Sequence, residues 1–123
     1  MTGVRPAEFI GSSKDDLSSF PEQVRVETGH ILWEIQRGKT HPNARPMRGK
    51  LRDVIEISVD DELGSRTFRT TCTVRIGDIV YVLHAFLKKS KLGISTPKRH
   101  LDLIERRLKE AWRHYEKSHG ETK

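Results

Sequence analysis

The sequence predicts an α+β fold in which two N-terminal helices precede a small antiparallel sheet, of three or four strands, and a C-terminal helix. Apolar residues recur at helical spacing near both ends of the chain. Between these regions lie three segments of strand character, two of them joined by a glycine-containing turn. With 123 residues the chain has the length of one ordinary domain, so we expect a single domain over residues 1–123.

The N-terminal third predicts two helices. Ser12 and Ser13 precede "KDDLSSF", a pattern typical of a short capped helix with acidic residues in its first turn. The segment "PEQVRVETGHILWEIQRG" begins with Pro21 and ends with Gly38, which are common start and stop signals of a helix. The segment that follows, residues 39–50, contains two prolines and is predicted to form a loop. The core face of the longer helix comprises Val24, Thr28, Ile31, Leu32 and Ile35.

Three strands are expected next, at "LRDVIEISV", "TFRTTCTVRI" and "IVYVLHAFLKK". Gly77 and Asp78 form a two-residue hairpin signal, so the second and third strands should pair antiparallel. In the middle strand, alternate residues share one face, and the face predicted to lie in the core carries Phe68, Thr70, Cys72, Val74 and Ile76. The last strand should be central in the sheet, because the residues on both of its faces are largely apolar. One face carries Tyr81, Leu83, Ala85 and Leu87, and the other carries Val80, Val82, His84, Phe86 and Lys88.

The C-terminal region predicts one amphipathic helix. Thr96 can serve as its N-cap and Pro97 as its first residue. Apolar residues then recur at the spacing of a helix face. The expected buried stripe comprises Leu101, Ile104, Leu108, Ala111, Trp112 and Tyr115.

The positive charge is concentrated in one part of the chain. The net charge is +6, and residues 86–113 contain nine Lys or Arg against three Asp or Glu, whereas the rest of the chain is balanced. Such a concentration predicts a polyanionic partner. For Arg106, Arg107 and Lys109 we favour an ordinary solvated helix face, and for the cluster "KKSK" at residues 88–91 a ligand-binding role.

Several function classes are disfavoured by the sequence. Cys72 is the single cysteine, and its alternation with apolar residues predicts a small buried side chain. The chain has no phosphate-binding glycine loop and no His or Cys spacing typical of zinc sites, so we expect no metal and no other cofactor. Its longest apolar run has nine residues, which predicts no membrane partner, and the absence of a secretory pattern favours the cytoplasm.

Five basic or titratable residues should come close together on neighbouring strands: Arg69, Arg75, His84, Lys88 and Lys89. This combination fits metal-free RNA cleavage, in which the 2′-hydroxyl attacks the adjacent phosphate. Arg and Lys stabilise the charge of the transition state, and His or a lysine of lowered pKa moves protons. The spacing of these residues is equally consistent with purely structural roles. His84 would then be a core histidine, and Arg69 a solvent-facing residue paired with Glu56 or Asp78.

The residues of nearly the whole chain resemble the phage-derived toxin family related to HigB and RelE. The segments that carry the likeness include "VIEISV", "FRTTCTV" and, most specifically, "VLHAFLKKS" followed by "TPKR". The resemblance implies the toxin of a type II toxin–antitoxin system, an mRNA endoribonuclease that acts on the ribosome and is held inactive by a cognate antitoxin protein. The family motif matches at Arg69, His84, Lys88, Lys89, Lys98 and Arg99. We therefore assign catalytic roles to Arg69, His84 and Lys88, and RNA binding to Lys89, Lys98 and Arg99 together with Lys91 of the basic cluster.

Three positions depart from the family pattern. Ser58 stands where an arginine is common, Cys72 where a tyrosine is common, and His100 where an acid is usual. The first two changes remove a base and an aromatic side chain suited to stacking on RNA. Two other functions are retained as alternatives, the second of them less favoured because the strand with His84, Lys88 and Lys89 points to RNA cleavage. One is a non-catalytic module that binds the ribosome or nucleic acid, and the other is a toxin that targets gyrase.

Overall fold

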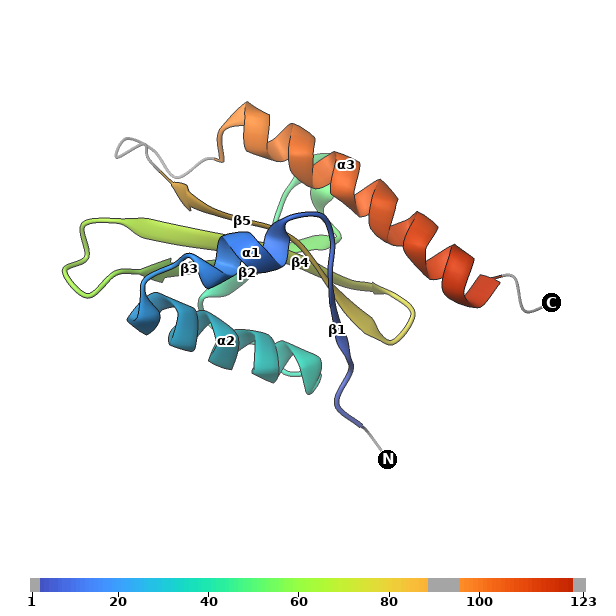
Figure 1. Cartoon of the computed structure of the whole chain (residues 1–123), viewed down its shortest axis with the longest axis horizontal. Coiled ribbons are helices and arrows are strands. Elements are labelled where there is room, and N and C mark those ends of the chain that lie inside the picture. Colours follow the sequence, from blue (N-terminus) through green and yellow to red (C-terminus); the bar gives the residue numbers. More distant parts are fainter. Residues whose placement is uncertain (1–2, 89–95, 121–123) are drawn as a thin grey trace.

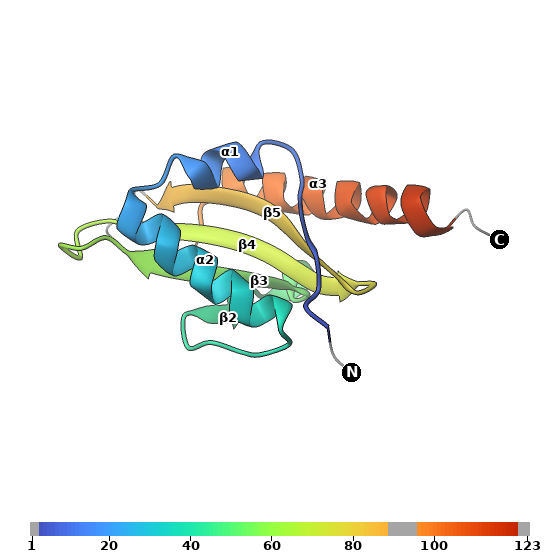
Figure 2. The ribbon, with the colours of Figure 1, turned by 60° about the horizontal axis from the view of Figure 1, so that its bottom comes forward.

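A computed structural model describes residues 3–88 and 96–120 of the chain. Its centre is a five-stranded mixed sheet with the strand order β1-β5-β4-β3-β2. Figure 2 shows α2 on one face of the sheet and α3 on the other, and Figure 1 gives the course of the chain between them. The architecture is therefore α+β, as predicted.

The three longest strands confirm the sequence prediction. They are β3 (Val54–Asp60), β4 (Thr67–Ile76) and β5 (Ile79–Lys88), and β4 pairs antiparallel with both of the others. Gly77 in the β4–β5 turn has φ 57°, the left-handed conformation that a Gly-first hairpin requires.

Two further strands correct the prediction of a purely antiparallel sheet of three or four strands. β1 (Ala7–Phe9) pairs parallel to β5, and β2 (Ala44–Pro46) pairs antiparallel to β3 inside the segment predicted as a loop. Each has three residues, which is too short for an alternating pattern to be recognised. β2 also contains a proline, which sheets tolerate at an edge strand. Pairing with longer strands, and not local propensity, orders both segments.

All three predicted helices are present. They are α1 (Ser13–Ser18), α2 (Glu22–Gln36) and α3 (Lys98–Tyr115), with a short 3₁₀ helix, η1 (Gly49–Leu51), before β3 and a π-helical turn, η2 (Glu116–Gly120), after α3. The N-cap of α3 is Pro97, so the prediction that Thr96 caps this helix is wrong. The Thr96 hydroxyl instead donates to Glu56 on β3.

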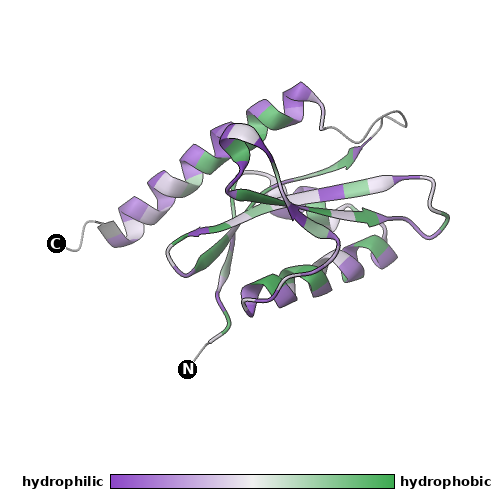
Figure 3. Ribbon diagram, turned by 180° about the vertical axis from the view of Figure 1, so that it is seen from behind, coloured by the Kyte–Doolittle hydropathy of each residue, from purple (hydrophilic) through white to green (hydrophobic). Residues whose placement is uncertain are grey.

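The core is divided between the two faces of the sheet. Leu17 of α1 and the apolar residues of α2 pack on one face with Phe68, Cys72 and Val82, whereas Ile104 of α3 packs on the other with Tyr81 and Leu83. Figure 3 shows the apolar side of α2 turned toward the sheet. Trp112 is 43% exposed, so its predicted place in the buried stripe of α3 is wrong.

A bulge in β5 overturns the predicted alternation of that strand. Thr71 pairs with His84 but Cys72 pairs with Val82, which leaves Leu83 as an extra residue. Val82 therefore packs toward α2, whereas Leu83 and His84 both lie toward α3. A second irregularity in β4 moves Ile76 into the α3 cluster, away from the face predicted for it.

Two glycines provide a matched test of this fold. A Cβ at Gly77 would lie 2.5 Å from Tyr115 Cε1, and the positive φ adds backbone strain, so we expect Gly77→Ala to cost more than about 1 kcal/mol of unfolding free energy. Gly29, inside α2, has open space around that position, and Gly29→Ala should stabilise the protein by about 0.5–1 kcal/mol. Urea denaturation of both variants checks these opposite signs.

Candidate active site

One end of the sheet gathers the predicted catalytic residues on the face that α3 covers. Arg69 of β4 lies directly opposite Phe86 of β5, and His84 and Lys88 flank Phe86 on the same face. Arg69, His84 and Lys88 are only 7%, 6% and 9% exposed. The site is therefore a largely desolvated group of basic side chains beneath the start of α3, where electrostatic interactions are stronger than in water.

Arg69 hydrogen-bonds to Glu56 of β3 and to Thr96, which lies just before α3. Its Nη1 donates to Glu56 Oε1 of β3 at 3.2 Å and to the Thr96 hydroxyl at 3.1 Å, and that hydroxyl donates to Glu56 Oε2 at 2.8 Å. Of the two carboxylates predicted as partners, Glu56 is the one bound, but the guanidinium is buried and not solvent-facing. These three side chains tie the segment just before α3 to strands β3 and β4.

Lys88 ends β5 directly opposite Thr67. Burial lowers the pKa of its ammonium group, the positive charge of Arg69 lowers it further, and the carboxylate of Glu56 acts in the opposite direction. A lysine in such surroundings releases a proton more readily than an exposed one.

His84 forms a hydrogen-bonded pair with His100 of α3. Its Nε2 lies 2.8 Å from Nδ1 of His100. The Phe86 ring stacks against both imidazoles, with centroid distances of 4.9 Å to His84 and 3.9 Å to His100. Nδ1 of His84 is buried and has no hydrogen-bond partner among residues 3–88 and 96–120.

The surroundings of the pair disfavour its protonation. Burial, followed by the nearby charges of His100 and Arg107, lowers the pKa of His84 to about 4, with Asp16 opposing. Burial and Arg99 also lower the pKa of His100. Both imidazoles are therefore neutral at pH 7.

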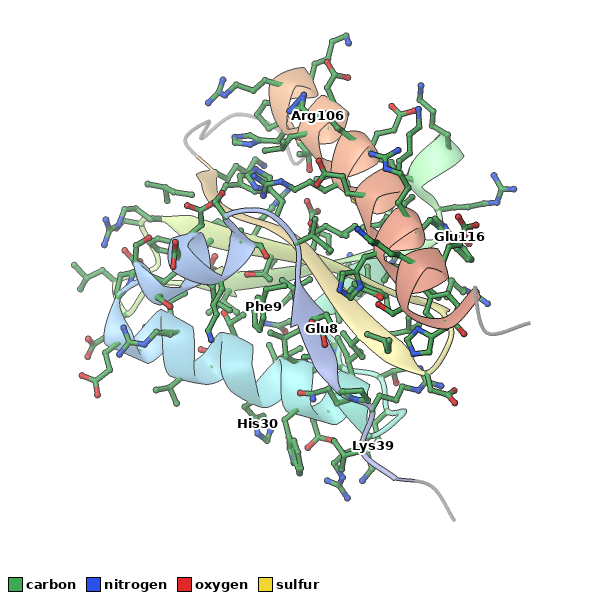
Figure 4. The ribbon with its side chains drawn as sticks, turned by 45° about the vertical axis from the view of Figure 1, so that its right-hand side comes forward. Glu8, Phe9, His30, Lys39, Arg106 and Glu116 are labelled. Carbon is green, nitrogen blue, oxygen red and sulfur yellow. The ribbon has the colours of Figure 1, made fainter. Side chains whose placement is uncertain are left out.

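Arg107 fixes the bulge that positions His84. Its Nη1 donates to the carbonyl of Leu83 at 3.0 Å and its Nη2 to the Ser12 hydroxyl at 3.0 Å. Gly11 permits this approach, because a Cβ there would lie 2.8 Å from Nε of Arg107. The prediction of an ordinary solvated residue is thus wrong for Arg107. Arg106 does lie on the outer side of α3, as Figure 4 shows.

The other predicted residues lie apart from this cluster or outside the described part of the chain. Lys98 and Arg99 are exposed at the start of α3, and Lys98 pairs with Asp102 at 3.0 Å. Arg75 is exposed and lies 3.9 Å from Asp53, away from the buried group. Lys89 and Lys91 fall outside the described residues.

Sequence reasoning missed two contributors to the site: Thr96 as the link between Glu56 and Arg69, and His100 as the partner of His84. Glu56 and Thr96 are 40 residues apart, so no local pattern joins them. His100 stood out only as a departure from a family pattern. No other local signal indicates its pairing with His84, which lies 16 residues earlier, on β5.

The described residues contain neither a metal-binding cluster nor a membrane-spanning helix. They include no group of three or more His, Cys, Asp or Glu that could hold a metal ion. None of their helices is long and apolar enough to cross a membrane. Cys72 is buried in the core, as predicted, and burial raises the pKa of its thiol to about 12.

The histidine pair predicts a pH-dependent stability. In the folded protein the pKa values of His84 and His100 lie below the ordinary histidine value of 6.5, so the unfolded chain takes up protons that the folded pair does not. The free energy of unfolding should therefore fall as the pH is lowered from 6.5 toward 4. Urea denaturation across this range measures the effect. His84→Gln, which lacks one of the two titrating groups, should lose less stability on acidification, and an unchanged slope would contradict the assignment.

Comparisons with known proteins were made for the whole chain. Residues 15–109 match the family described as phage derived protein Gp49-like (DUF891). No match was found among curated proteins. Among solved structures, the fold is similar to a chain of the toxin–antitoxin complex RelBE2 from Mycobacterium tuberculosis, with a TM-score of 0.51 and 12% sequence identity over 73% of this chain and 98% of that chain.

Proposed function

Because the chain belongs to the Gp49-like family of phage-derived proteins, we propose that it is the toxin of a toxin–antitoxin pair. The proposal is supported by the likeness of its fold to a chain from a toxin–antitoxin complex. We further propose that the toxin cleaves mRNA without a metal ion, on the ribosome and in the cytoplasm, and that a cognate antitoxin neutralises it.

The observation that carries this proposal is the group formed on one face of the sheet by three buried side chains, Arg69, Lys88 and His84, with the partly exposed His100. An anionic phosphate is the ligand that best matches two desolvated basic side chains, since each gains a charge-assisted hydrogen bond. The neutral imidazoles supply ring nitrogens that can accept a proton. Binding RNA here requires the phosphate to compete with Glu56 for Arg69.

The proposed reaction is cleavage by the substrate's own 2′-hydroxyl. The 2′-oxygen forms a bond to phosphorus while the bond from phosphorus to the 5′-oxygen breaks, giving a 2′,3′-cyclic phosphate and a 5′-hydroxyl end. Arg69 binds the phosphate and stabilises the added charge of the transition state. His84 belongs to the proton-transfer part of the site, and Lys88, whose pKa is lowered, offsets phosphate charge and donates the proton that the departing 5′-oxygen takes.

Exposed bases at the start of α3 would guide RNA toward this group. Lys98 and Arg99 are exposed in the first turn of α3, and Thr96, two residues before the helix, contacts Arg69. Lys89 and Lys91 keep the RNA-binding role proposed from the sequence. Such contacts act mainly through charge, so RNA affinity should weaken as salt is raised.

Induction of the gene in a bacterial host tests the proposal, with growth and mapped mRNA 5′ ends followed together. Growth arrest with new 5′ ends is expected, and co-expression of a small neighbouring gene should restore growth and yield a complex. Arrest without new 5′ ends would favour the non-catalytic binding module or the gyrase-targeting toxin. Normal growth with folded protein present would contradict the toxin assignment.

A further inference from the structure

The two histidines of the pair are not equivalent toward a ligand. In an imidazole the two nitrogens lie on either side of Cε1, so a ring that uses one nitrogen in a hydrogen bond directs the other away from it. His84 uses Nε2, and its Nδ1 is buried. His100 uses Nδ1 and is partly exposed, so its Nε2 is the nitrogen of the pair that a ligand can reach.

We propose that His100 is a catalytic residue of this site, the general base that takes the proton of the attacking 2′-hydroxyl, and that His84 is its positioning residue. The inference rests on the proposed ribonuclease function. It assigns His100 a role that none of its sequence features suggested, and it limits His84 to acting through His100.

The position of His100 relative to Arg69 supports this role. Thr96, one turn before His100 along the chain, accepts a hydrogen bond from Arg69, and Phe86, which lies opposite Arg69, stacks on the His100 ring at 3.9 Å. The phosphate-binding guanidinium and the proposed base therefore belong to one packed group. A general base must lie within hydrogen-bond reach of the hydroxyl that it deprotonates, so a base packed against the phosphate-binding residue is suitably placed for this step.

The charges around the pair favour protonation of His100 before His84. The charged groups that act on the two rings are Arg99 and Arg107 of α3 and Asp16 of α1. A positive charge on His100 is one of the causes that keep the pKa of His84 low. His84 therefore stays neutral when His100 takes a proton, and its Nε2 accepts the Nδ1–H of the new imidazolium in a charge-assisted hydrogen bond.

The proton balance of the step is simple. The step uses the tautomer in which His100 carries its proton on Nδ1 and donates it to Nε2 of His84, so that Nε2 of His100 has a free electron pair. That pair takes the 2′-hydroxyl proton as the 2′-oxygen bonds to phosphorus. Holding the base in the correct tautomer through a second residue is the logic by which a triad orients its histidine.

The test compares His100→Ala with a matched control on the same helix. His114 bonds to Tyr81 Oη through its Nδ1 at 2.8 Å, the same distance as in the His84 pair, but lies nearly four turns further along α3. With folded, purified protein, His100→Ala should lower the RNA cleavage rate by about 10²–10⁴-fold, and His114→Gln should leave it unchanged. Added imidazole should restore part of the His100→Ala rate, because it replaces the missing base.

His84→Phe tests the positioning role, because it keeps an aromatic ring beside Phe86 and removes the accepting nitrogen. The wild-type rate should rise with pH and level off above the pKa of His100, since the base must be deprotonated. In His84→Phe the maximal rate should drop. The midpoint of the pH–rate profile should move to lower pH, because the imidazolium of His100 has lost the nitrogen that accepts its hydrogen bond. A merely structural role would lower the folded fraction and leave this midpoint where it is.

The outcomes separate this inference from the proposed function. A His100→Ala protein that cleaves RNA at the wild-type rate, or that loses activity and is not rescued by imidazole, overturns the role of His100 while cleavage by the wild type upholds the ribonuclease. Folded wild-type protein that cleaves no RNA, with or without ribosomes, overturns both.

Discussion

Replacing Arg69 with alanine is expected to lower the RNA cleavage rate by about 10²–10³-fold, the cost of removing one preorganised donor to a charged transition state. Arg69 is 7% exposed, so its interaction with a bound phosphate is little screened by water. The rate is measured on a defined mRNA with ribosomes present, at saturating protein, so that weaker binding is separated from slower cleavage.

A second variant, Arg69→Lys, separates the charge of Arg69 from the geometry of its guanidinium. It keeps the positive charge but loses the planar fork that contacts phosphate oxygens in pairs, so most of the activity should still be lost. Removing the guanidinium also leaves Glu56 without this partner, and the double variant Arg69→Ala with Glu56→Gln controls for that destabilisation. A folded Arg69→Ala protein with wild-type activity would remove Arg69 from the mechanism.

Glu56→Ala is expected to cost about 3 kcal/mol of unfolding free energy, because it removes one member of a largely buried ion pair. It also removes the acceptor of the Thr96 hydroxyl, which fastens the start of α3 to the sheet. The measurement is the midpoint of urea denaturation at pH 7, at constant denaturant slope.

Glu105→Ala is the matched control for that change. Glu105 pairs with Lys50 at 3.4 Å, and the lysine of this pair is exposed, so the loss should be no more than about 1 kcal/mol. Equal losses in Glu56→Ala and Glu105→Ala would mean that the Arg69 pair is no stronger than an exposed one. The account of a desolvated site would then be wrong.

The parts of the fold that were predicted correctly are those with local signals. The boundaries of α2 follow from Pro21, Gly38 and a helical apolar period, and the β4–β5 hairpin follows from Gly77. β1 and β2 gave no such signal, because three residues are too few for a period and their order comes from pairing with β5 and β3. The local sequence pattern therefore predicts the long helices and strands, whereas the short strands form only because they pair with longer ones.

The candidate site was predictable as a group of strand residues but not as a network. Arg69, His84 and Lys88 lie on one face because alternation holds over the last part of β5. The bulge at Leu83 interrupts the alternation earlier, and its carbonyl is held by Arg107, a residue 24 positions later that sequence reasoning left on a solvated surface. Thr96 shows a second limit of prediction from sequence. Its residue type suits a helix cap, but its hydroxyl hydrogen-bonds to Glu56, which is distant in the chain.

The chemistry of the RNA ends tests the central claim most directly. Purified protein, ribosomes and a defined mRNA are incubated together, and the new ends are analysed for their terminal groups. We predict cleavage by the wild type that leaves a 2′,3′-cyclic phosphate and a 5′-hydroxyl, and little cleavage by Arg69→Lys at equal folded concentration. Intact mRNA in the presence of folded wild-type protein, or equal cleavage by wild type and Arg69→Lys, would contradict the assignment of this site as a ribonuclease centre.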